Sequence, residues 1–192
     1  PIIPLKKRLE LLHTIETVLK ENDQAICEAI HADFGNRSFH ETRILEITPS
    51  ILGLRHTRRK LKKWMKPQRR HCSMIFLGGR NRVIPQAKGI VGIITPWNYP
   101  LFLAISPMTS ALAAGNRVMV KQAANSLHLC RLLHDKFSQK IDPAFVCFHP
   151  GVSAGTFSGL PFNHLVFTGS PRTGKTVMKT AADNLVPVTL EL

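Results

Sequence analysis

The chain has 192 residues, of which 44% are hydrophobic, and a formal net charge of +14 at neutral pH. This balance predicts a soluble globular protein that buries a substantial core, in one large domain or in parts of two. Four cysteines without a C-x-x-C pair argue against a zinc site or a disulfide framework and favour a cytoplasmic location. No signal peptide, membrane span or metal site is expected, and Pro1 is not expected to be the native start.

The first part of the chain has a helical pattern. Apolar residues recur at helical spacing from Leu5 to Leu19 and predict the first helix. Asn22 or Asp23 is expected to cap a second helix, which Gly35 ends.

A third predicted helix carries the basic run Arg55–Arg70. One interpretation is a binding module for nucleic acid, since clustered Lys and Arg attract phosphates. The favoured one is the solvated face of an amphipathic helix that Pro67 ends, because Leu61 and Trp64 recur at helical spacing and no nucleic-acid motif accompanies the charge. We therefore expect no specific nucleic-acid partner.

A linker is expected next. The apolar runs Met74–Leu77 and Val83–Ile84 flank two glycines and predict two short strands, in a hairpin or an extended arm. The predicted organisation is an N-terminal helical part (1–71), linker strands (72–88) and a Rossmann-like part (89–192).

From Gly89 onward, apolar strands alternate with amphipathic helices, which predicts an α/β fold with a parallel sheet covered on both faces. Ligands bind beyond the carboxyl ends of such strands. The expected strands are 90–94, 118–120, 145–148, 165–167 and 186–190, and the expected helices are 101–114, 126–140, 154–158 and 172–182.

The segment Gly169–Thr176 matches the G-x-x-x-x-G-K-[ST] phosphate loop and lies between a predicted strand and a predicted helix. It keeps a nucleotide triphosphatase open as an alternative. Against it, Pro171 lacks one amide donor of the phosphate cradle, and the residues after Thr176 leave no room for an acidic, magnesium-binding strand.

Three motifs carry a family resemblance. They are GIVGIITPWNYPLFLAISPMTSALAAGNRVMVK, which contains a turn with two prolines around Trp97, Asn98 and Tyr99, then FNHLVFTGSPRTGK and NLVPVTLEL. In this order they resemble the aldehyde dehydrogenase superfamily, in its coniferyl-aldehyde-dehydrogenase-like branch. The similarity extends back through HADFGNRSFHETRILEITPS. The chain then corresponds to roughly the first two fifths of a member and ends within the family's E-L-G-G motif.

The resemblance assigns catalytic roles to Asn98 and Glu191. Asn98 matches the amide that donates to the oxyanion formed when a thiolate attacks the aldehyde carbon. Glu191 matches the general base for the water that hydrolyses the thioester. By themselves, the residues allow two other roles, a turn-stabilising Asn and a charge at a strand end.

The resemblance also implies NAD or NADP as cofactor, without the G-x-G-x-x-G fingerprint. One group of matching residues walls the dinucleotide, a lysine contacts the adenosine ribose, and a turn presents a helix N-terminus to the pyrophosphate. In that order they are Ile94, Thr95, Pro96 and Trp97, then Lys121, then Gly169 and Ser170.

One departure concerns the ribose. Members commonly have K-P-S-E after the second strand, whereas this chain has Ala124 in place of the Glu that binds the ribose hydroxyls. Losing that acceptor and its charge predicts weaker selectivity for NAD and better tolerance of NADP. A degenerate copy of the family is the alternative.

A second departure is the nucleophile, which in the family lies beyond E-L-G-G. None of Cys27, Cys72, Cys130 and Cys147 matches it, so the chain alone is expected to be inactive. For the full-length parent, the resemblance implies oxidation of an aromatic or long-chain aldehyde to a carboxylic acid, and a homodimer assembled through the linker strands.

Overall fold

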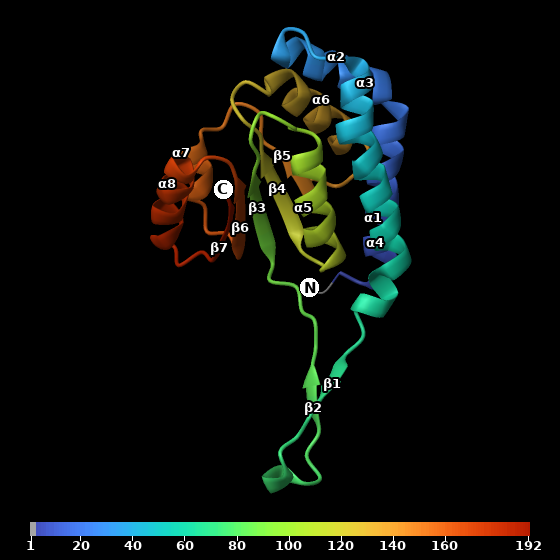
Figure 1. Cartoon of the computed structure of the whole chain (residues 1–192), viewed down its shortest axis with the longest axis vertical. Coiled ribbons are helices and arrows are strands. Elements are labelled where there is room, and N and C mark those ends of the chain that lie inside the picture. The colour runs from blue at the N-terminus through green and yellow to red at the C-terminus, as the bar shows by residue number, and fades with distance from the viewer. Residues whose placement is uncertain (1–2) are drawn as a thin grey trace.

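The computed structural model describes residues 3–192 as an α/β fold built on a five-stranded parallel sheet (Figure 1). The sheet order is β5-β4-β3-β6-β7, and every neighbouring pair is parallel. The predicted fold class is confirmed. The strands are β3 (Ile90–Ile94), β4 (Arg117–Lys121), β5 (Val146–Phe148), β6 (His164–Thr168) and β7 (Val188–Glu191).

Helices alternate with the strands of the sheet, and further helices precede it. The helices expected from apolar spacing form within a few residues of their predicted bounds. They are α1 (Leu5–Glu21), α2 (Asp23–Phe34), α4 (Thr48–Trp64), α5 (Phe102–Ala113), α6 (Leu127–Ser138), α7 (Ala154–Ser158) and α8 (Pro171–Ala182). The short helix α3 (Phe39–Thr42) and the π-helix η1 (Arg43–Ile47) form in addition.

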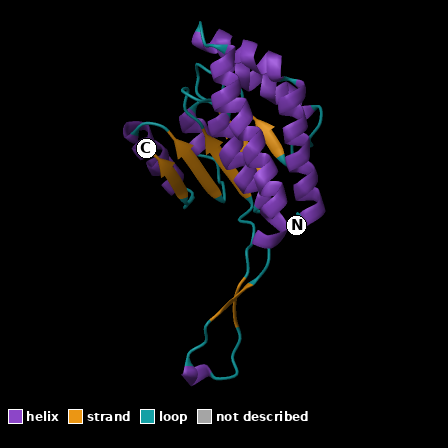
Figure 2. Ribbon diagram, turned by 45° about the vertical axis from the view of Figure 1, so that its right-hand side comes forward, coloured by secondary structure: helices purple, strands orange, loops and turns teal. Residues whose placement is uncertain are grey.

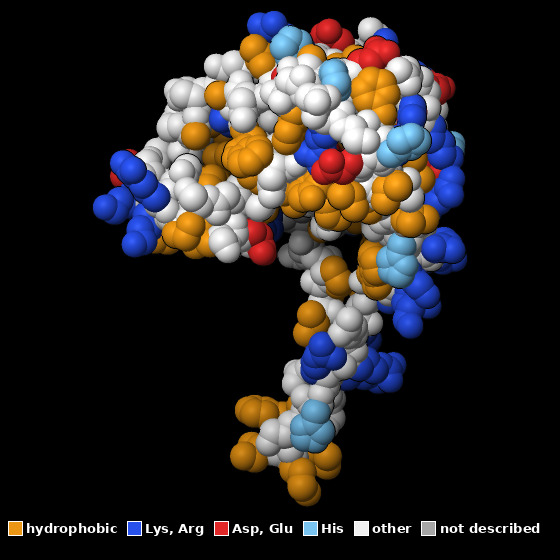
Figure 3. Space-filling model, turned by 45° about the horizontal axis from the view of Figure 1, so that its top comes forward, with side chains coloured by type: hydrophobic (Ala, Val, Ile, Leu, Met, Phe, Trp, Pro, Cys, Tyr) orange, Lys and Arg blue, Asp and Glu red, His pale blue; other side chains and the backbone are white. Residues whose placement is uncertain are grey.

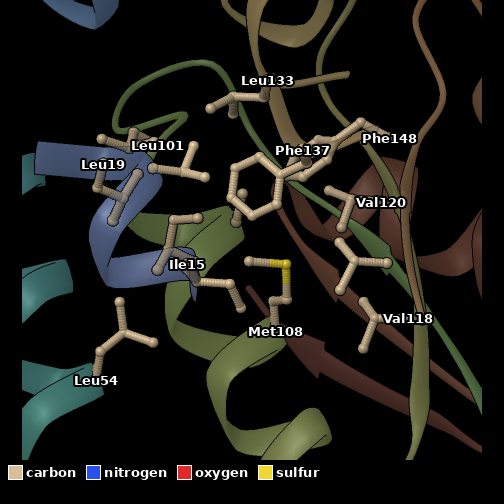
Figure 4. Packing of buried hydrophobic residues seen from close by; sticks show 14 of the residues in the cluster. Ile15, Leu19, Leu54, Leu101, Met108, Val118, Val120, Leu133, Phe137 and Phe148 are labelled. Atoms are coloured by element: carbon tan, nitrogen blue, oxygen red, sulfur yellow. The ribbon is translucent and has the colours of Figure 1, made fainter. Parts of the chain in front are cut away.

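The two faces of the sheet have separate cores. On one face α1, α2, α4, α5 and α6 pack over β3, β4 and β5, and on the other α7 and α8 pack over β6 and β7. The larger core joins the N-terminal helices directly to the sheet, as Figure 4 shows for Ile15, Leu54, Met108 and Val118. Because successive strand residues point to opposite faces, Ile93 belongs to the larger core and Ile94 to the smaller one.

The C-terminal end of α5 is fixed by a buried arginine. Gly115 ends the helix with φ 91°, as predicted, in a region that favours glycine. Arg8 donates from Nη1 to the Ala113 carbonyl at 2.9 Å and from Nε to the Ile3 carbonyl at 2.7 Å. A Cβ atom on residue 115 would lie 2.4 Å from the Arg8 guanidinium, so this contact requires glycine.

The linker forms an extended arm that leaves the body of the protein (Figure 2). Its two strands, β1 (Gln68–Arg70) and β2 (Asn81–Val83), pair antiparallel. The predicted strand Met74–Leu77 is wrong: residues 74–76 form a 3₁₀ turn, η2, at the tip. Nothing in the described chain covers this apolar run, and its side chains are 67–90% exposed (Figure 3).

The basic run lies mostly on α4, as the amphipathic-helix interpretation predicts, and part of it is paired. Glu16 of α1 is 4% exposed and accepts from Arg55 Nε at 2.7 Å and from Arg58 Nη1 at 2.8 Å. Lys20 lies 2.6 Å from the same carboxylate. Two of the basic side chains therefore hold α4 against α1.

Within residues 3–192, no helix is both long and apolar enough to cross a membrane.

The Glu16 cluster predicts a pH-dependent contribution to stability. Burial alone would raise the pKa of Glu16, but hydrogen bonds and charges from Lys20 and Arg55 outweigh it and lower the pKa from 4.5 to about 2. A lowered carboxyl pKa stabilises the folded state above pH 4.5, and this contribution is lost as the pH falls toward 2. Glu16→Gln should lower the free energy of unfolding by about 1.5–3 kcal/mol at pH 7, measured by urea denaturation.

The difference between Glu16→Gln and wild type should shrink as the pH falls from 5 to 2. Glu10→Gln is the matched control, because Glu10 forms an exposed pair with Lys7 and should cost less than about 1 kcal/mol. An equal loss for Glu16→Gln at pH 7 and pH 2.5 would contradict the assignment.

Candidate functional site

Four neighbouring strands end at the same edge of the sheet and bring the predicted site residues together. Register pairs Ile94 with Lys121, and Thr168 with Glu191. Two hydrogen bonds continue the ladder past the strand ends: Thr95 N–H donates to the Lys121 carbonyl at 3.1 Å, and Gly169 N–H donates to the Glu191 carbonyl at 3.0 Å. The turns after β3 and β6 therefore leave the sheet side by side.

A cavity of about 450 Å³ opens between these turns. It is bounded by the turn after β3, the turn after β6 and the end of β7. The lining residues are Pro96, Trp97, Asn98, Thr168, Gly169, Ser170, Glu191 and Leu192. Both predicted catalytic residues thus lie in one cavity, together with Pro96, Trp97, Gly169 and Ser170 of the predicted cofactor residues. Ile94, Thr95 and Lys121 do not line it.

The hydrogen bonding of Asn98 leaves its amide NH₂ as the outward polar group. Asn98 is exposed, and its Oδ1 accepts from the Tyr99 backbone N–H at 3.0 Å. An N–H donor requires an oxygen acceptor, so this contact fixes which side-chain atom is Oδ1 and leaves Nδ2 to donate. The side chain can therefore offer a donor to an anionic oxygen.

Glu191 is exposed and ends β7 at the edge of the cavity. Its backbone is fixed by the bond from Gly169, while its carboxylate is open to water within the described residues. Strand β6 separates the strands that lead to Asn98 and Glu191. The two groups approach the cavity from different sides.

The remaining predicted cofactor residues are buried and do not line the cavity. Ile94 packs in the smaller core, and Thr95 is 3% exposed, with no partner for its Oγ1 among the described residues. Lys121 is 8% exposed, and burial lowers its pKa. A buried ammonium gains from a polar or anionic partner, which fits a ligand at this strand end.

Trp97 extends the apolar wall of the cavity and is 56% exposed. Its ring lies 6.1 Å from the ring of Phe34, at the end of α2. The wall is therefore partly supported by the N-terminal helices.

The phosphate-loop interpretation of Gly169–Thr176 is wrong. Helix α8 begins at Pro171, so most of the segment is helical and no loop remains to wrap a phosphate chain. Ser170 is the N-cap, and its Oγ accepts from the Thr173 N–H at 3.3 Å. Lys175 is an exposed residue of the helix. The turn and the start of α8 still border the cavity through Gly169 and Ser170.

None of the four cysteines lines the cavity. Cys27 and Cys130 are buried in helices, Cys147 lies in β5, and Cys72 lies in the arm. Burial raises the pKa of Cys130 to about 11 and also raises those of Cys27 and Cys147. These thiols are therefore poor nucleophiles at neutral pH.

Among residues 3–192, no group of three or more His, Cys, Asp or Glu side chains is arranged to hold a metal ion.

Sequence reasoning missed three polar residues that hold the turn after β3. Gln122 donates from Nε2 to the Pro100 carbonyl at 2.8 Å. Arg37 donates to the Asn98 carbonyl, and Glu46 accepts from the Leu101 N–H at 2.7 Å. Arg37 and Glu46 are far from the turn in sequence, so no local pattern could reveal them. Gln122 directly follows β4, but the comparison with K-P-S-E drew a conclusion only for Ala124.

Comparison with known proteins gives one consistent result. Residues 2–192 match the model of the aldehyde dehydrogenase family. The "Probable coniferyl aldehyde dehydrogenase" of Pseudomonas aeruginosa is 45% identical over 194 residues, which cover 100% of this chain and 41% of that protein.

Two solved structures are similar over nearly the whole chain. AldH from Staphylococcus aureus in its substrate-bound state has a TM-score of 0.93 and 29% identity, and covers 98% of this chain and 42% of its own. The NAD+ complex of an aldehyde dehydrogenase from Bacillus cereus has a TM-score of 0.83 and 25% identity, with 99% and 39% covered. The chain thus spans about two fifths of the length of these proteins.

The close packing of the turn after β6 predicts that Gly169 cannot be replaced without loss. A Cβ atom at this position would lie 2.6 Å from the Phe167 ring, and that ring is 3% exposed. Gly169→Ala should therefore lower the free energy of unfolding by about 1–3 kcal/mol in urea denaturation.

The matched control is Gly155→Ala in α7, where the nearest atom to the added Cβ is Ser153 Oγ at 3.9 Å. That variant should be neutral or up to about 1 kcal/mol more stable. Equal stability of the two variants would show that the turn tolerates a side chain.

Proposed function

Because the chain belongs to the aldehyde dehydrogenase family, we propose that it forms the cofactor-binding part, and one side of the active site, of an enzyme that oxidises an aldehyde to a carboxylic acid with NAD or NADP. The observation that carries this proposal is the cavity of about 450 Å³ that brings Asn98 and Glu191 together with the turn before α8. The chain spans 41% of the Pseudomonas aeruginosa relative, so the whole activity is proposed for the protein that includes it.

The donors around the cavity fit a dinucleotide. The N-terminal end of α8, a helix of 12 residues, borders the cavity and favours a phosphate group. Lys121 offers a buried ammonium at the end of β4, and Trp97 and Pro96 offer an apolar wall. When bound, the nicotinamide cofactor supplies the acceptor for the hydride of the aldehyde. The NAD+ complex of the Bacillus cereus protein supports this assignment.

We assign Asn98 the role of oxyanion donor. Its Oδ1 is engaged by the Tyr99 N–H, so Nδ2 remains to stabilise negative charge that develops on the aldehyde oxygen. Glu191, across the cavity, is assigned to take a proton from the water that releases the acid. The thiolate that this chemistry needs is none of the four cysteines of the chain, so we expect the 192 residues alone to be inactive.

The substrate and partner assignments rest on the relatives and on the arm. The name of the Pseudomonas aeruginosa relative supports coniferyl aldehyde, and therefore an aromatic aldehyde. We also propose a homodimer that covers the exposed apolar tip of the arm, where Leu77 is 90% exposed. The four free cysteines support a cytoplasmic location.

Removing the Asn98 amide should reduce turnover without unfolding the enzyme. Asn98→Ala, made in the protein expressed from the complete reading frame, should lower kcat for coniferyl aldehyde about 10²–10³-fold. Asn36→Ala is the control, because Asn36 is exposed and does not line the cavity. Equal kcat for wild type and Asn98→Ala would exclude the oxyanion role.

Cofactor selectivity should depend on position 124. Ala124 is exposed just beyond β4. The Ala124→Glu substitution would add an acceptor for ribose hydroxyls and a charge that repels a 2′-phosphate. We expect the wild-type dissociation constants for NAD and NADP to lie within about tenfold, and Ala124→Glu to weaken NADP at least tenfold in titration calorimetry.

The control for charge is Ala144→Glu. Ala144 is also exposed, but it lies just before β5, at the amino ends of the strands and away from the site. This substitution should leave both dissociation constants unchanged. A wild-type protein that strongly prefers NAD would contradict the relaxed selectivity.

A further inference from the structure

The turn that carries Asn98 is held by two buried charged residues from another part of the chain. Thr95–Pro100 leaves the sheet after β3 and contains two prolines, which supply no backbone N–H. Arg37 follows α2, and Glu46 lies in the π-helix η1. Arg37 contacts the Asn98 carbonyl and also pairs with Glu41 of α3 at 3.1 Å, while Glu46 contacts the start of α5.

Glu46 fixes the start of α5. It is 0% exposed, and its Oε2 accepts from the backbone N–H of Leu101 at 2.7 Å and of Phe102 at 3.2 Å. These amides are among the first N–H donors of the helix, which have no partner within it. A carboxylate there also interacts favourably with the positive end of the helix dipole. Leu101 itself is fully buried in the larger core. The C-terminal side of the turn is thereby anchored.

The π-helix is the element that places this carboxylate. The segment Arg43–Ile47 lies between α3 and α4 without a break in the helical path. A π-turn holds one more residue than an α-turn, and such turns are frequent at functional sites. Here the π-helix carries Glu46 and Ile47, both buried, and Glu46 contacts the start of α5.

Arg37 fixes the peptide of Asn98. Its Nη1 donates to the Asn98 carbonyl, and its guanidinium lies 4.6 Å from the centre of the Phe34 ring and 4.8 Å from that of the Tyr99 ring. It is 6% exposed. Its Nη2 is 3.7 Å from Glu46 Oε1, too far for a hydrogen bond, so the pairing of these two charges is only coulombic.

A structural role alone is a poor explanation for this arrangement. A buried ion pair seldom adds net stability, and here Glu46 Oε1 lacks a hydrogen bond among the described residues, while Arg37 Nη2 pairs instead with Glu41 Oε1 at 3.1 Å. The two side chains instead fix the conformation of the turn around Asn98. The Asn98 carbonyl is held by Arg37, the Tyr99 ring stacks on the same guanidinium, and the Tyr99 N–H holds Asn98 Oδ1. The direction of Asn98 Nδ2 follows from these contacts.

We propose that Arg37 and Glu46 are positioning residues that aim the side-chain amide of Asn98 into the cavity. This inference rests on the proposed function of Asn98 as oxyanion donor. It assigns the N-terminal helices a part in catalysis, because a donor misplaced by about 1 Å can cost on the order of 10²-fold in rate.

The test is a double-mutant cycle in the protein expressed from the complete reading frame. Arg37→Met should lower kcat for coniferyl aldehyde about 10- to 100-fold, while the dissociation constant for the cofactor stays within about twofold. In the Asn98→Ala background, Arg37→Met should cause almost no further loss, because the group that it positions is absent. A residue that only stabilises the fold would instead reduce the activity of both backgrounds by the same factor.

Two further variants keep the test informative if Arg37→Met does not fold. Arg37→Lys keeps the charge but loses the planar group that stacks on both rings, and should also lower kcat. Glu46→Gln keeps one acceptor for the α5 amides and should retain more activity than Glu46→Ala. The matched control is Arg131→Met, which removes an exposed arginine of α6 that does not line the cavity and should leave kcat unchanged.

Failure of the inference can be told apart from failure of the proposed function. If the wild-type protein oxidises no aldehyde, the proposed function fails. The positioning is then judged by the side-chain amide signals of Asn98 in ¹⁵N-asparagine-labelled protein, which Arg37→Met should shift and Arg131→Met should not. An active wild type with unchanged kcat in Arg37→Met, or multiplicative losses in the cycle, would overturn the inference.

Discussion

The bond between the Glu46 carboxylate and the first amides of α5 is the interaction on which the candidate site depends. Past Thr95 the chain leaves the sheet ladder, and Pro96 and Pro100 cannot donate backbone bonds. Such a turn has few local means of holding one shape. Its order comes from side chains outside it, with Glu46 at its end, Arg37 at its middle and Gln122 at the Pro100 carbonyl.

The same interaction explains why the N-terminal helices share a core with the sheet. Burying a carboxylate costs several kcal/mol unless it is hydrogen-bonded, so η1 must be pressed closely against α5. Ile47 and Leu54 belong to the larger core together with Leu101 and Met108, and they provide that apolar contact. Figure 4 shows Leu54, Leu101 and Met108 in this core. Glu16 of α1 accepts hydrogen bonds from Arg55 and Arg58 of α4 and so holds these two helices together. The geometry of the candidate site therefore depends on how the N-terminal helices pack against α5.

The sequence predicts the elements well where periodicity is set by burial, and poorly elsewhere. Strand β3 forms at its predicted bounds because every residue from Val91 to Ile94 is buried. The run Met74–Leu77 has the composition of a strand, but nothing in the described chain covers it, so local turns prevail. The phosphate-loop pattern fails for a related reason: a motif records residue types, whereas the N-cap Ser170 decides where α8 begins.

The candidate site was predictable only through residues close to the strand ends. Strand ends gather at one edge in any parallel sheet, so Asn98, Gly169 and Glu191 could be placed together before the fold was known. Arg37 and Glu46 could not. Their partners lie 61 and 55 residues away, and a charged residue in a helical stretch is normally expected on the solvated face.

The order of the strands also limits what this cavity can do. Between β3 and β7 lies β6, so at about 4.8 Å per strand the two catalytic candidates start from backbones about 10 Å apart. Asn98 follows β3 and Glu191 ends β7, so the two side chains reach the cavity from different strands. None of the four cysteines lines the cavity, so the attacking group of the proposed chemistry must come from outside these 192 residues. In the proposed reaction, the Asn98 amide acts as a donor only if it is held in place before the substrate binds. The buried contacts of Arg37 and Glu46 supply that rigidity.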